Sequence, residues 1–241
     1  MVQLAIDEVK VWYSTAESLT SEFVASKSSL LSADERLQWE KFRHDRDRDR
    51  YLITRVMARE ILGDYLGIEP QALRFQRSST GKPEVESRLS ARHVQFNITH
   101  CEGLVALALA QGPVGIDAEP KNRQIELDVA RLILTGEEQS ELQSWPVEHK
   151  RYRLLQYWTM KEALVKAMGV GFSKPLDSVA VQFTAYNEPQ ISHLLGDVSG
   201  SGNWFVFQSA DQFADHLFSL ALKHSNRSNP RISFSPWQTN P

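Results

Sequence analysis

The first half of the chain passes from strand-like to helix-like spacing of its apolar residues. Segment 9–14, VKVWYS, alternates and is rich in β-forming residues, so it predicts a strand. A helix is expected around 21–31. Ser32, with Glu35 three residues later, has the spacing of a capping box that opens another helix. Within the helical pattern of 51–66, five apolar residues share one broad face: Ile53, Val56, Met57, Ile61 and Leu62.

Strands and turns follow, and the pattern changes at Gly112–Pro113. The stretches LRFQRSSTGKPEV and VQFNITHCEGLVALALA indicate strands separated by turns rich in Gly and Ser. After the Gly-Pro pair, helices are expected at 125–134, 136–143 and 148–168. Strands are expected at SVAVQF, PQISHLL, NWFVFQS and HLFSLALK.

These elements predict an α+β fold in which two similar halves share one chain. The Gly-Pro pair is the best joint between them, which places the halves at 1–112 and 113–224. The tail at 225–241 is polar and rich in Pro and Ser, so we expect it to be extended or disordered.

Composition excludes several classes of protein. Hydrophobic residues make up 41% of the chain, and the net charge of −3 gives no overall field to attract nucleic acid or an anionic membrane. A single cysteine, Cys101, excludes an internal disulfide framework. No apolar run approaches the ~20 residues that span a bilayer, and the first residues lack the pattern of a secretion signal. We therefore expect a cytoplasmic protein.

Two acidic residues in the apolar segment VGIDAEP share one face of a predicted strand. Side chains alternate along a strand, so Asp117 and Glu119 point one way while Ile116 and Ala118 point the other. Carboxylates held this close repel each other unless a cation neutralises them, and a hard divalent ion such as Mg²⁺ is the usual partner. The alternative is a surface strand that displays two solvated acids.

The stretch LQYWTMKEALVKAMGVG predicts an amphipathic helix whose outer face carries charges. Its inner stripe is apolar: Met160, Ala163, Leu164, Ala167 and Met168. Glu162 and Lys166 lie one turn apart on the opposite face. They form either an exposed ion pair, worth about 0.3–0.5 kcal/mol, or groups that act on a ligand. Trp158 and Val165 flank this face, which favours its interpretation as the wall of a cleft. For Lys161 two interpretations stay open, contact with phosphate or structural pairing.

Two further segments leave alternatives open. FNITHCEG places Thr99 and His100 at a strand-to-turn junction, where a histidine serves as a base, a ligand or neither. The run RHDRDRDR at 43–50 is either a solvated helix end laced with ion pairs or a source of arginines for an anion. Cys101 is expected to be structural, because neighbours on a strand point to opposite faces. Motifs of P-loop, nucleophile-elbow, zincin and dinucleotide-binding proteins are absent.

Four segments, taken in order, resemble the motifs of one enzyme family. GKP, FNITHCEG, VGIDAEP and WTMKEALVKAMGVGF are similar to the ordered motifs of the 4′-phosphopantetheinyl transferases. The resemblance runs from about Leu31 to Phe183 and is to the larger, surfactin-synthetase-activating type rather than to the small trimeric holo-acyl-carrier-protein synthases. It implies two similar halves related by pseudo-twofold symmetry, coenzyme A in the cleft between them, and a monomeric chain.

The resemblance also implies a role for individual residues. Asp117, Glu119 and Glu162 match the acids that bind Mg²⁺ (or Mn²⁺), and Glu162 also matches the base for the acceptor serine. Lys166 matches the lysine that contacts phosphate and assists the leaving group, so the expected catalytic set is Glu162, Lys166 and Asp117. The expected contacts to coenzyme A are Arg50, Gly81, Lys82, Pro83, Thr99, His100 and Lys166. The implied reaction transfers 4′-phosphopantetheine from coenzyme A to a serine of an apo acyl or peptidyl carrier protein and releases 3′,5′-ADP.

One departure concerns the 3′-phosphate of coenzyme A. Where the best-known member of this type has basic residues before the KFRHD region, this chain has Glu35 and Gln38. We expect one of four arginines to take over, namely Arg36, Arg43, Arg46 or Arg50, and favour Arg50 because it is nearest the onset of the matched helix. The acidic helix of the carrier is expected to meet a basic or apolar patch around the loop before His149–Arg153. Two alternatives remain open: a Mg²⁺-dependent phosphodiesterase acting on nucleic acid, and a non-catalytic coenzyme A-binding module.

Overall fold

The helices of the protein form the outer layers of the fold. The computed structural model describes residues 4–15, 20–86, 94–169, 175–184, 188–194, 203–224 and 229–237. Its helices are α1 (Ser21–Lys27), α2 (Ala33–Glu40), α3 (Asp45–Leu66), α4 (Ala130–Ile133), α5 (Gly136–Ser144) and α6 (Val147–Met168). Short 3-10 helices are η1 (Ser28–Leu30), η2 (Pro70–Ala72), η4 (Leu127–Val129) and η6 (Leu176–Ser178). Within the described residues, no helix is long and apolar enough to cross a membrane.

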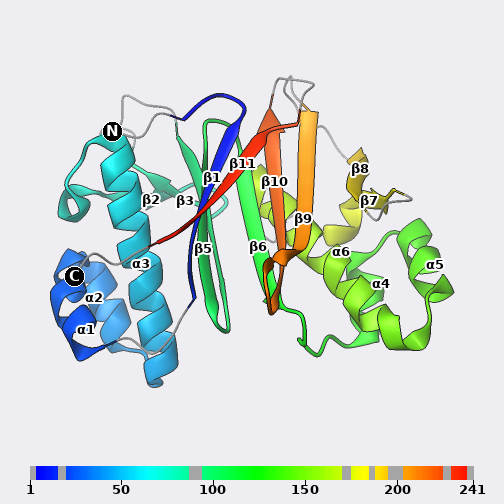
Figure 1. The fold of residues 1–241 in the computed structure, drawn as a ribbon, viewed down its shortest axis with the longest axis horizontal. Helices are drawn as coiled ribbons and strands as arrows, with labels where there is room; N and C mark the ends of the chain where they lie inside the picture. The colour runs from blue at the N-terminus through cyan, green and yellow to red at the C-terminus, as the bar shows by residue number, and fades with distance from the viewer. Residues whose placement is uncertain are drawn as a thin grey trace.

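Two sheets form the inner layers. The strands are β1 (Glu8–Thr15), β2 (Phe75–Arg77), β3 (Pro83–Val85), β4 (Gln95–Cys101), β5 (Leu104–Ala110), β6 (Val114–Pro120), β7 (Val179–Phe183), β8 (Pro189–Leu194), β9 (Asn203–Phe213), β10 (His216–His224) and β11 (Arg231–Pro236). One sheet has the order β11-β1-β5-β4 and the other β6-β10-β9, while β2–β3 and β7–β8 are small antiparallel pairs. Figure 1 shows α3 outside the first sheet and α6 outside the second. The predicted α+β fold with two halves is confirmed.

Small and large side chains alternate along β5, and this alternation explains how β5 packs between the second sheet and helix α3. Every residue of this strand, LVALALA, is buried. Its small residues face a core shared with the second sheet, where Ala106 and Ala108 pack with Ile116 and Leu220. Its larger residues, such as Leu107, pack in a separate cluster with α3. Small side chains on one face let the two sheets approach, and large ones on the other fill the space beneath the helix.

Helix α3 begins earlier than its apolar pattern indicated. It opens at Asp45, so most of the Arg/Asp run forms its first turns. Ion pairs three residues apart join Arg48 to Asp45 at 3.2 Å and Arg50 to Asp47 at 2.6 Å. The interpretation of this run as a helix end laced with ion pairs is confirmed for these residues. The capping box of Ser32 at the start of α2 is also present.

The C-terminal tail contributes a strand to the first sheet. β11 lies parallel to β1, with Val11 opposite Phe234. Beyond it, the indole Nε1 of Trp237 donates a hydrogen bond to Glu60 Oε2 of α3 at 3.1 Å. The segment we expected to be extended or disordered is therefore extended and paired at 231–236. Its residues 225–228 and 238–241 lie outside the described residues, as do positions 170–172 of the WTMKEALVKAMGVGF motif.

Candidate active site

A glycine allows α6 to lie directly against β6. A Cβ added at Gly115 would collide with the Ala163 carbonyl oxygen and would lie 2.9 Å from Ala167 Cα. Only a residue without a side chain fits between strand and helix at this separation. The close approach places the charged face of α6, with Glu162 and Lys166, beside the face of β6 that carries Asp117.

Asp117 is the buried centre of the site. Its side chain is 7% exposed, and its Oδ1 accepts a hydrogen bond from Lys166 Nζ at 2.6 Å. Lys166 also donates to the Ile116 carbonyl oxygen at 3.2 Å. Desolvation raises the pKa of Asp117, while the amine of Lys166 acts in the opposite direction. Asp117 Oδ2 is buried and has no hydrogen-bond partner among the described residues, so this oxygen is available to a ligand.

The two other acids share the electrostatic field of Asp117. Desolvation raises the pKa of Glu119 and of Glu162, and the charge of Asp117 raises both further. Arg123 offsets this repulsion, because its Nη1 donates to Glu119 Oε1. The same guanidinium lies over the ring of Trp158, 5.0 Å from its centroid. The charge of Asp117 therefore affects the pKa of both other carboxylates, and Trp158 forms part of the wall around the three.

Arg123 was missed from the sequence. It lies outside each quoted motif. It follows Glu119 by four residues, but β6 ends at Pro120, so this spacing does not predict that the two side chains meet. Its role depends on how the chain turns back after the strand, where Arg123 N donates to the Pro120 carbonyl oxygen.

The donor set fits a hard divalent cation. Among the described residues, no three His, Cys, Asp or Glu side chains converge closely enough to form a metal cage on their own. Two of the three acids are instead ion-paired with cationic side chains: Asp117 with Lys166, and Glu119 with Arg123. Three carboxylates with one unpartnered, buried oxygen are the oxygen ligands that Mg²⁺ and Mn²⁺ prefer. A cation bound at the unpartnered oxygen would add to the neutralisation that Lys166 and Arg123 provide.

Strand β4 joins the first sheet to the site. Asn97 Oδ1 accepts a hydrogen bond from Ile116 N at 3.0 Å, and Thr99 Oγ1 accepts one from Ala118 N at 3.3 Å. Thr99 also donates to Asp117 Oδ1 at 3.4 Å. The side chains of β4 thus bind the backbone of β6 and hold Asp117 in place. Thr99 is buried, and both of these hydrogen-bond partners belong to β6.

His100, next along β4, is exposed and lies in a positive field. Its pKa is lowered first by desolvation and then by the charges of Arg50 and Lys166, with a smaller contribution from Arg55. His100 therefore adds a donor to a group of cations that comes from α3 and α6. Its neighbour Cys101 is buried, which agrees with a structural role.

The GKP turn contacts the C-terminal end of α6. Gly81 has a φ of +90°, a left-handed conformation that favours glycine. Thr80 Oγ1 donates to the Gly169 carbonyl oxygen. Lys82 Nζ donates to the Val114 carbonyl oxygen at 3.2 Å, and desolvation lowers the pKa of Lys82 to about 8. Lys82 thus connects the two halves through backbone carbonyls.

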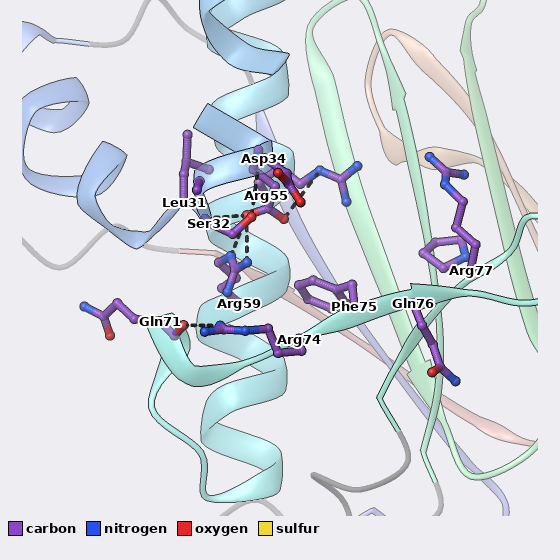
Figure 2. Close-up of a pocket in the computed structure, with 13 residues that line it drawn as sticks. Leu31, Ser32, Asp34, Arg55, Arg59, Gln71, Arg74, Phe75, Gln76 and Arg77 are labelled. Carbon is purple, nitrogen blue, oxygen red and sulfur yellow. Dashed lines mark hydrogen bonds and ion pairs between the residues drawn. The ribbon is translucent and has the colours of Figure 1, made fainter. Parts of the chain in front are cut away.

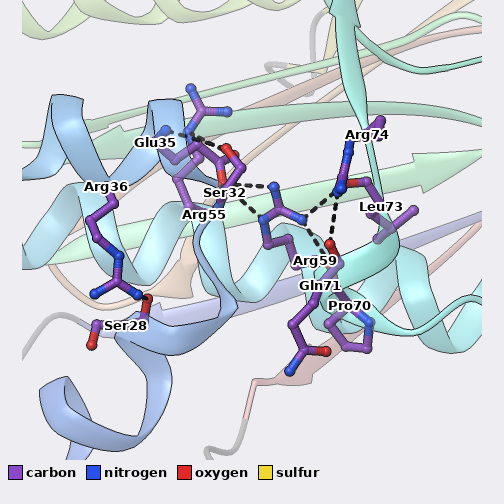
Figure 3. A network of polar contacts seen from close by, with 10 residues as sticks. All are labelled: Ser28, Ser32, Glu35, Arg36, Arg55, Arg59, Pro70, Gln71, Leu73 and Arg74. Atoms are coloured by element: carbon purple, nitrogen blue, oxygen red, sulfur yellow. Dashed lines mark hydrogen bonds and ion pairs between the residues drawn. The ribbon is translucent and has the colours of Figure 1, made fainter.

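A groove next to this turn is rich in arginine. It has a volume of about 770 Å³ and opens between the start of α2, the middle of α3 and the β2–β3 pair, as Figure 2 shows. Its lining includes Arg55, Arg59, Arg74, Arg77 and Pro83. We call it the arginine groove. Glu35, one of the two residues found where basic residues were expected, is paired with Arg59 at 2.7 Å and is an acceptor for the groove's cations (Figure 3).

Lys161 has a structural role. Its side chain is fully buried, and Nζ lies 2.6 Å from Glu138 Oε2. It also donates to the carbonyl oxygens of Val179 at 2.7 Å and Leu176 at 3.2 Å. Of the two interpretations left open by the sequence, structural pairing is therefore the one observed.

Comparison with known proteins assigns the chain to a family. A model described as "4′-phosphopantetheinyl transferase, N-terminal" matches residues 14–112, and one described as "4′-phosphopantetheinyl transferase superfamily" matches residues 113–221. The chain is 32% identical over 183 residues to the 4′-phosphopantetheinyl transferase HetI of Nostoc sp., an alignment that covers 75% of this chain and 76% of HetI. It is 30% identical over 169 residues to the 4′-phosphopantetheinyl transferase Sfp of Bacillus subtilis, covering 70% of this chain and 73% of Sfp.

Among solved structures, the holo-[acyl-carrier-protein] synthase of Thermotoga maritima matches with a TM-score of 0.41 and 21% identity, over 47% of this chain and 64% of that one. The relatives and family models show that the chain belongs to the 4′-phosphopantetheinyl transferase superfamily. Within the superfamily it lies in the Sfp-type group, which confirms the resemblance seen in the motifs.

Proposed function

We propose that the protein transfers the 4′-phosphopantetheine group of coenzyme A to a serine of an apo acyl or peptidyl carrier protein, with Mg²⁺, and releases 3′,5′-ADP. The observation that carries this proposal is the position of Glu162 and Lys166 beside the buried Asp117, in a chain of this family. Phosphoryl transfer to an alcohol requires a proton acceptor and positive charge near the phosphate, and these three side chains supply both.

Asp117, Glu119 and Glu162 are the residues that would hold the metal. When bound, Mg²⁺ (or Mn²⁺) supplies positive charge to the pyrophosphate oxygens of coenzyme A. Asp117 is held for this role by Thr99 on one side and Lys166 on the other. Its buried Oδ2 is already free of protein partners within the described residues, so binding a cation there breaks no hydrogen bond.

Glu162 is the residue we propose as the general base. A serine hydroxyl is a weak nucleophile at neutral pH, so a neighbouring group has to accept its proton as the new bond to phosphorus forms. Desolvation raises the pKa of Glu162, which makes its carboxylate a better proton acceptor than an exposed glutamate. The Glu162 side chain is half-buried on the face of α6 that lies beside Asp117, one turn after Trp158.

Lys166 is the residue we propose to stabilise the phosphate. As the serine oxygen approaches and the bond to the leaving 3′,5′-ADP lengthens, negative charge grows on the phosphate oxygens. The Nζ of Lys166 carries three donors, and one of them is used by Asp117 and one by the Ile116 carbonyl oxygen. The third can donate to a phosphate oxygen while the first two hold the amine in place.

Coenzyme A is proposed to contact the side chains around this centre. The proposed contacts are Arg50, Gly81, Lys82, Pro83, Thr99, His100 and Lys166. His100 and Arg50 are supported by the positive field that they share. Lys82 and Thr99 are already bonded to protein oxygens, so for them we propose positioning of the turn and of Asp117 as the main contribution.

The carrier protein is proposed to dock on the second half, around the start of α6. Leu132 and Val147 are 73% and 74% exposed, which is unusual for large apolar side chains. Arg131 and Lys150 line a groove of about 350 Å³ in the same region. An apolar surface with cations at its rim suits the acidic helix of a carrier protein. We further propose that the protein acts as a monomer in the cytoplasm.

One incubation tests the proposed function. Apo carrier protein, coenzyme A and Mg²⁺ are combined with the enzyme, and the intact mass of the carrier is measured. The expected result is a gain of one phosphopantetheine group together with the appearance of 3′,5′-ADP, and the loss of both when EDTA is added. Mn²⁺ is expected to restore the reaction. No mass gain on any acyl or peptidyl carrier, with the enzyme folded, would sink the proposal.

A further inference from the structure

Arg123 contacts two residues of the wall around the buried Asp117. Its Nη1 donates to Glu119 Oε1, and its guanidinium carbon lies 5.0 Å from the centroid of the Trp158 ring. The side chain is 34% exposed, so the carboxylate and the ring hold a cation at the edge of the site. A guanidinium is not deprotonated in proteins. Arg123 is therefore a permanent positive charge beside the three acids.

The two cations of the site hold their acids in different ways. Lys166 is bonded both to Asp117 Oδ1 and to the Ile116 carbonyl oxygen, and Asp117 keeps its Oδ2 without a partner among the described residues. A ligand can therefore reach Asp117 while Lys166 stays in place. Within the described part of the chain, the guanidinium of Arg123 has one hydrogen-bond acceptor, which is Glu119 Oε1. A ligand that takes this oxygen has to displace Arg123.

The charge of Arg123 acts on all three acids of the site, which are Asp117, Glu119 and Glu162. Desolvation raises the pKa of each acid, and Arg123 is among the charges that lower it. A charge that stabilises the empty, anionic site also repels a divalent cation, because like charges are screened only weakly where water is partly excluded. Arg123 thus opposes a metal ion both by its charge and by its bond to Glu119.

The pyrophosphate of coenzyme A carries the charge that reverses this balance. It adds anionic oxygen ligands for a divalent cation, and its negative charge offsets the positive charge of Arg123. A cation that binds together with coenzyme A therefore meets less repulsion than a cation that binds to the protein alone.

We propose that Arg123 competes with the divalent cation for Glu119, and that this competition makes tight metal binding depend on coenzyme A. The inference rests on the proposed function, because it takes Glu119 as a metal ligand. Arg123 acts through Glu119 and is a positioning residue. The result is a coupling between two ligands, since coenzyme A strengthens metal binding by the same factor as the metal strengthens binding of coenzyme A.

Binding of Mn²⁺ tests the inference without any transfer reaction. Free Mn²⁺ is measured by electron paramagnetic resonance, with and without coenzyme A, for the wild type, Arg123→Gln, Arg123→Lys and Lys121→Gln. Lys121→Gln is the matched control, because it removes the same charge from an exposed side chain that donates to the Ala214 carbonyl oxygen. Asp117→Ala measures binding outside the site, and Mn²⁺ bound by coenzyme A itself is measured without protein. Thermal unfolding of each variant is followed in parallel.

Arg123→Gln is expected to bind Mn²⁺ alone about threefold to thirtyfold more tightly, the effect of removing one like charge from a partly screened site. With coenzyme A present, its affinity for Mn²⁺ should stay within about twofold of the wild type, so the strengthening by coenzyme A becomes smaller. Arg123→Lys should gain less than Arg123→Gln, because it keeps the charge and loses only the planar fork. Lys121→Gln should bind Mn²⁺ as the wild type does.

A folded Arg123→Gln protein that binds Mn²⁺ alone no more tightly than the wild type would overturn the inference. An equal gain in Lys121→Gln would overturn it as well, because the effect would then follow from net charge. So would a gain that persists when Asp117→Ala is combined with Arg123→Gln, since the ion would then lie elsewhere. Should Arg123→Gln fail to fold, an unchanged affinity of Arg123→Lys for Mn²⁺ alone would count against the inference in the same way.

The same variants separate this inference from the proposed function. Tighter binding of Mn²⁺ by Arg123→Gln, in a protein that modifies no carrier, would refute the transferase proposal alone. Transfer to a carrier by the wild type, together with an unchanged affinity of Arg123→Gln for Mn²⁺, would refute only the role of Arg123.

Discussion

Lys166 Nζ lies 2.6 Å from Asp117 Oδ1, and this contact joins the last turns of α6 to the middle of β6. The pair is partly shielded from water, because the side chain of Asp117 is buried while that of Lys166 is 29% exposed. The lysine can therefore donate to an incoming phosphate from its exposed side, whereas the carboxylate is enclosed by protein. This asymmetry makes Asp117 the fixed point of the site.

Asp117→Ala should abolish metal-dependent transfer while the fold persists. The substitution removes a buried carboxylate and leaves Lys166 able to reach solvent, so we expect a decrease in the transfer rate of at least about 10²-fold. Transfer is followed by the mass of the carrier protein, and folding by circular dichroism. Asp64→Ala, which removes an exposed acid from α3, is the matched control and should keep the wild-type rate. A folded Asp117→Ala variant with the wild-type rate would show that the metal assignment is wrong.

Gly115→Ala should destabilise the protein, since the new methyl group would meet the backbone of α6 at Ala163 and Ala167. We expect a loss of about 1–3 kcal/mol in the free energy of unfolding, typical of overpacking. Gly136→Ala is the matched control. A Cβ at that position meets nothing within 4 Å, so the substitution should be neutral or stabilise by about 0.4–1 kcal/mol. Urea unfolding measures both, and equal effects would contradict the close-approach explanation.

Lys161→Met should lower the free energy of unfolding without a specific effect on the affinity for coenzyme A. The change leaves the buried Glu138 without its partner, which typically costs about 3–5 kcal/mol of unfolding free energy. Adding Glu138→Gln should recover part of the loss, whereas Lys41→Met at an exposed position should have little effect. A Lys161→Met protein of normal stability but reduced affinity for coenzyme A would contradict the structural role.

Lys82 should make stability depend on pH in the alkaline range. Its pKa is lowered to about 8 by desolvation, whereas an unfolded lysine has a pKa of about 10.4. Between these values the unfolded chain binds more protons at this residue than the folded chain does. Lys82 therefore makes the free energy of unfolding rise as the pH rises from about 8 to about 10.4.

The control for this prediction is Lys82→Met. Urea unfolding at several pH values should show that the stability of the wild type, relative to Lys82→Met, increases across this window and is flat below it. Parallel curves for the two proteins would contradict the shifted pKa.

Cys101 should resist thiol reagents in the folded protein. Desolvation, followed by the charges of Glu119 and Asp117, raises the pKa of its thiol to about 12, so very little thiolate is present at pH 8. We expect negligible labelling under native conditions and one label per chain in urea. Rapid native labelling would show that the thiol is accessible and would contradict its structural role.

Local sequence rules predicted the elements well where the signal lies within a few residues. The capping box of Ser32 and Glu35, and the apolar face of α3, are of this kind. The pairing of Asp117 with Glu119 was likewise available from strand alternation. Local rules missed features that depend on contacts between distant segments. Arg123 reaches Glu119 only because of the turn after β6, and β11 is a strand only because β1 provides a parallel neighbour.

Burial is the second property that the sequence could not supply. Lys161 and Lys166 occupy one helix and are both charged, yet one is enclosed by Glu138 and the other faces Asp117. A helical pattern distinguishes faces, but it does not show which polar face meets a second layer. The arginine groove illustrates the same limit, because Arg55 and Arg59 are four residues apart on α3, yet Glu35 lies 2.7 Å from Arg59 and 4.0 Å from Arg55.

The parallel pairing of β11 with β1 has a consequence for dividing the molecule. A cut at Gly112–Pro113, the joint predicted from the sequence, would remove β11 from the fragment 1–112 and expose the edge of β1 to other chains. It would also separate Trp237 from its acceptor on α3. The two fragments are therefore not self-sufficient modules. Co-expressed, they should behave as a donor and a recipient of one strand, so that solubility of the first fragment depends on the presence of the second.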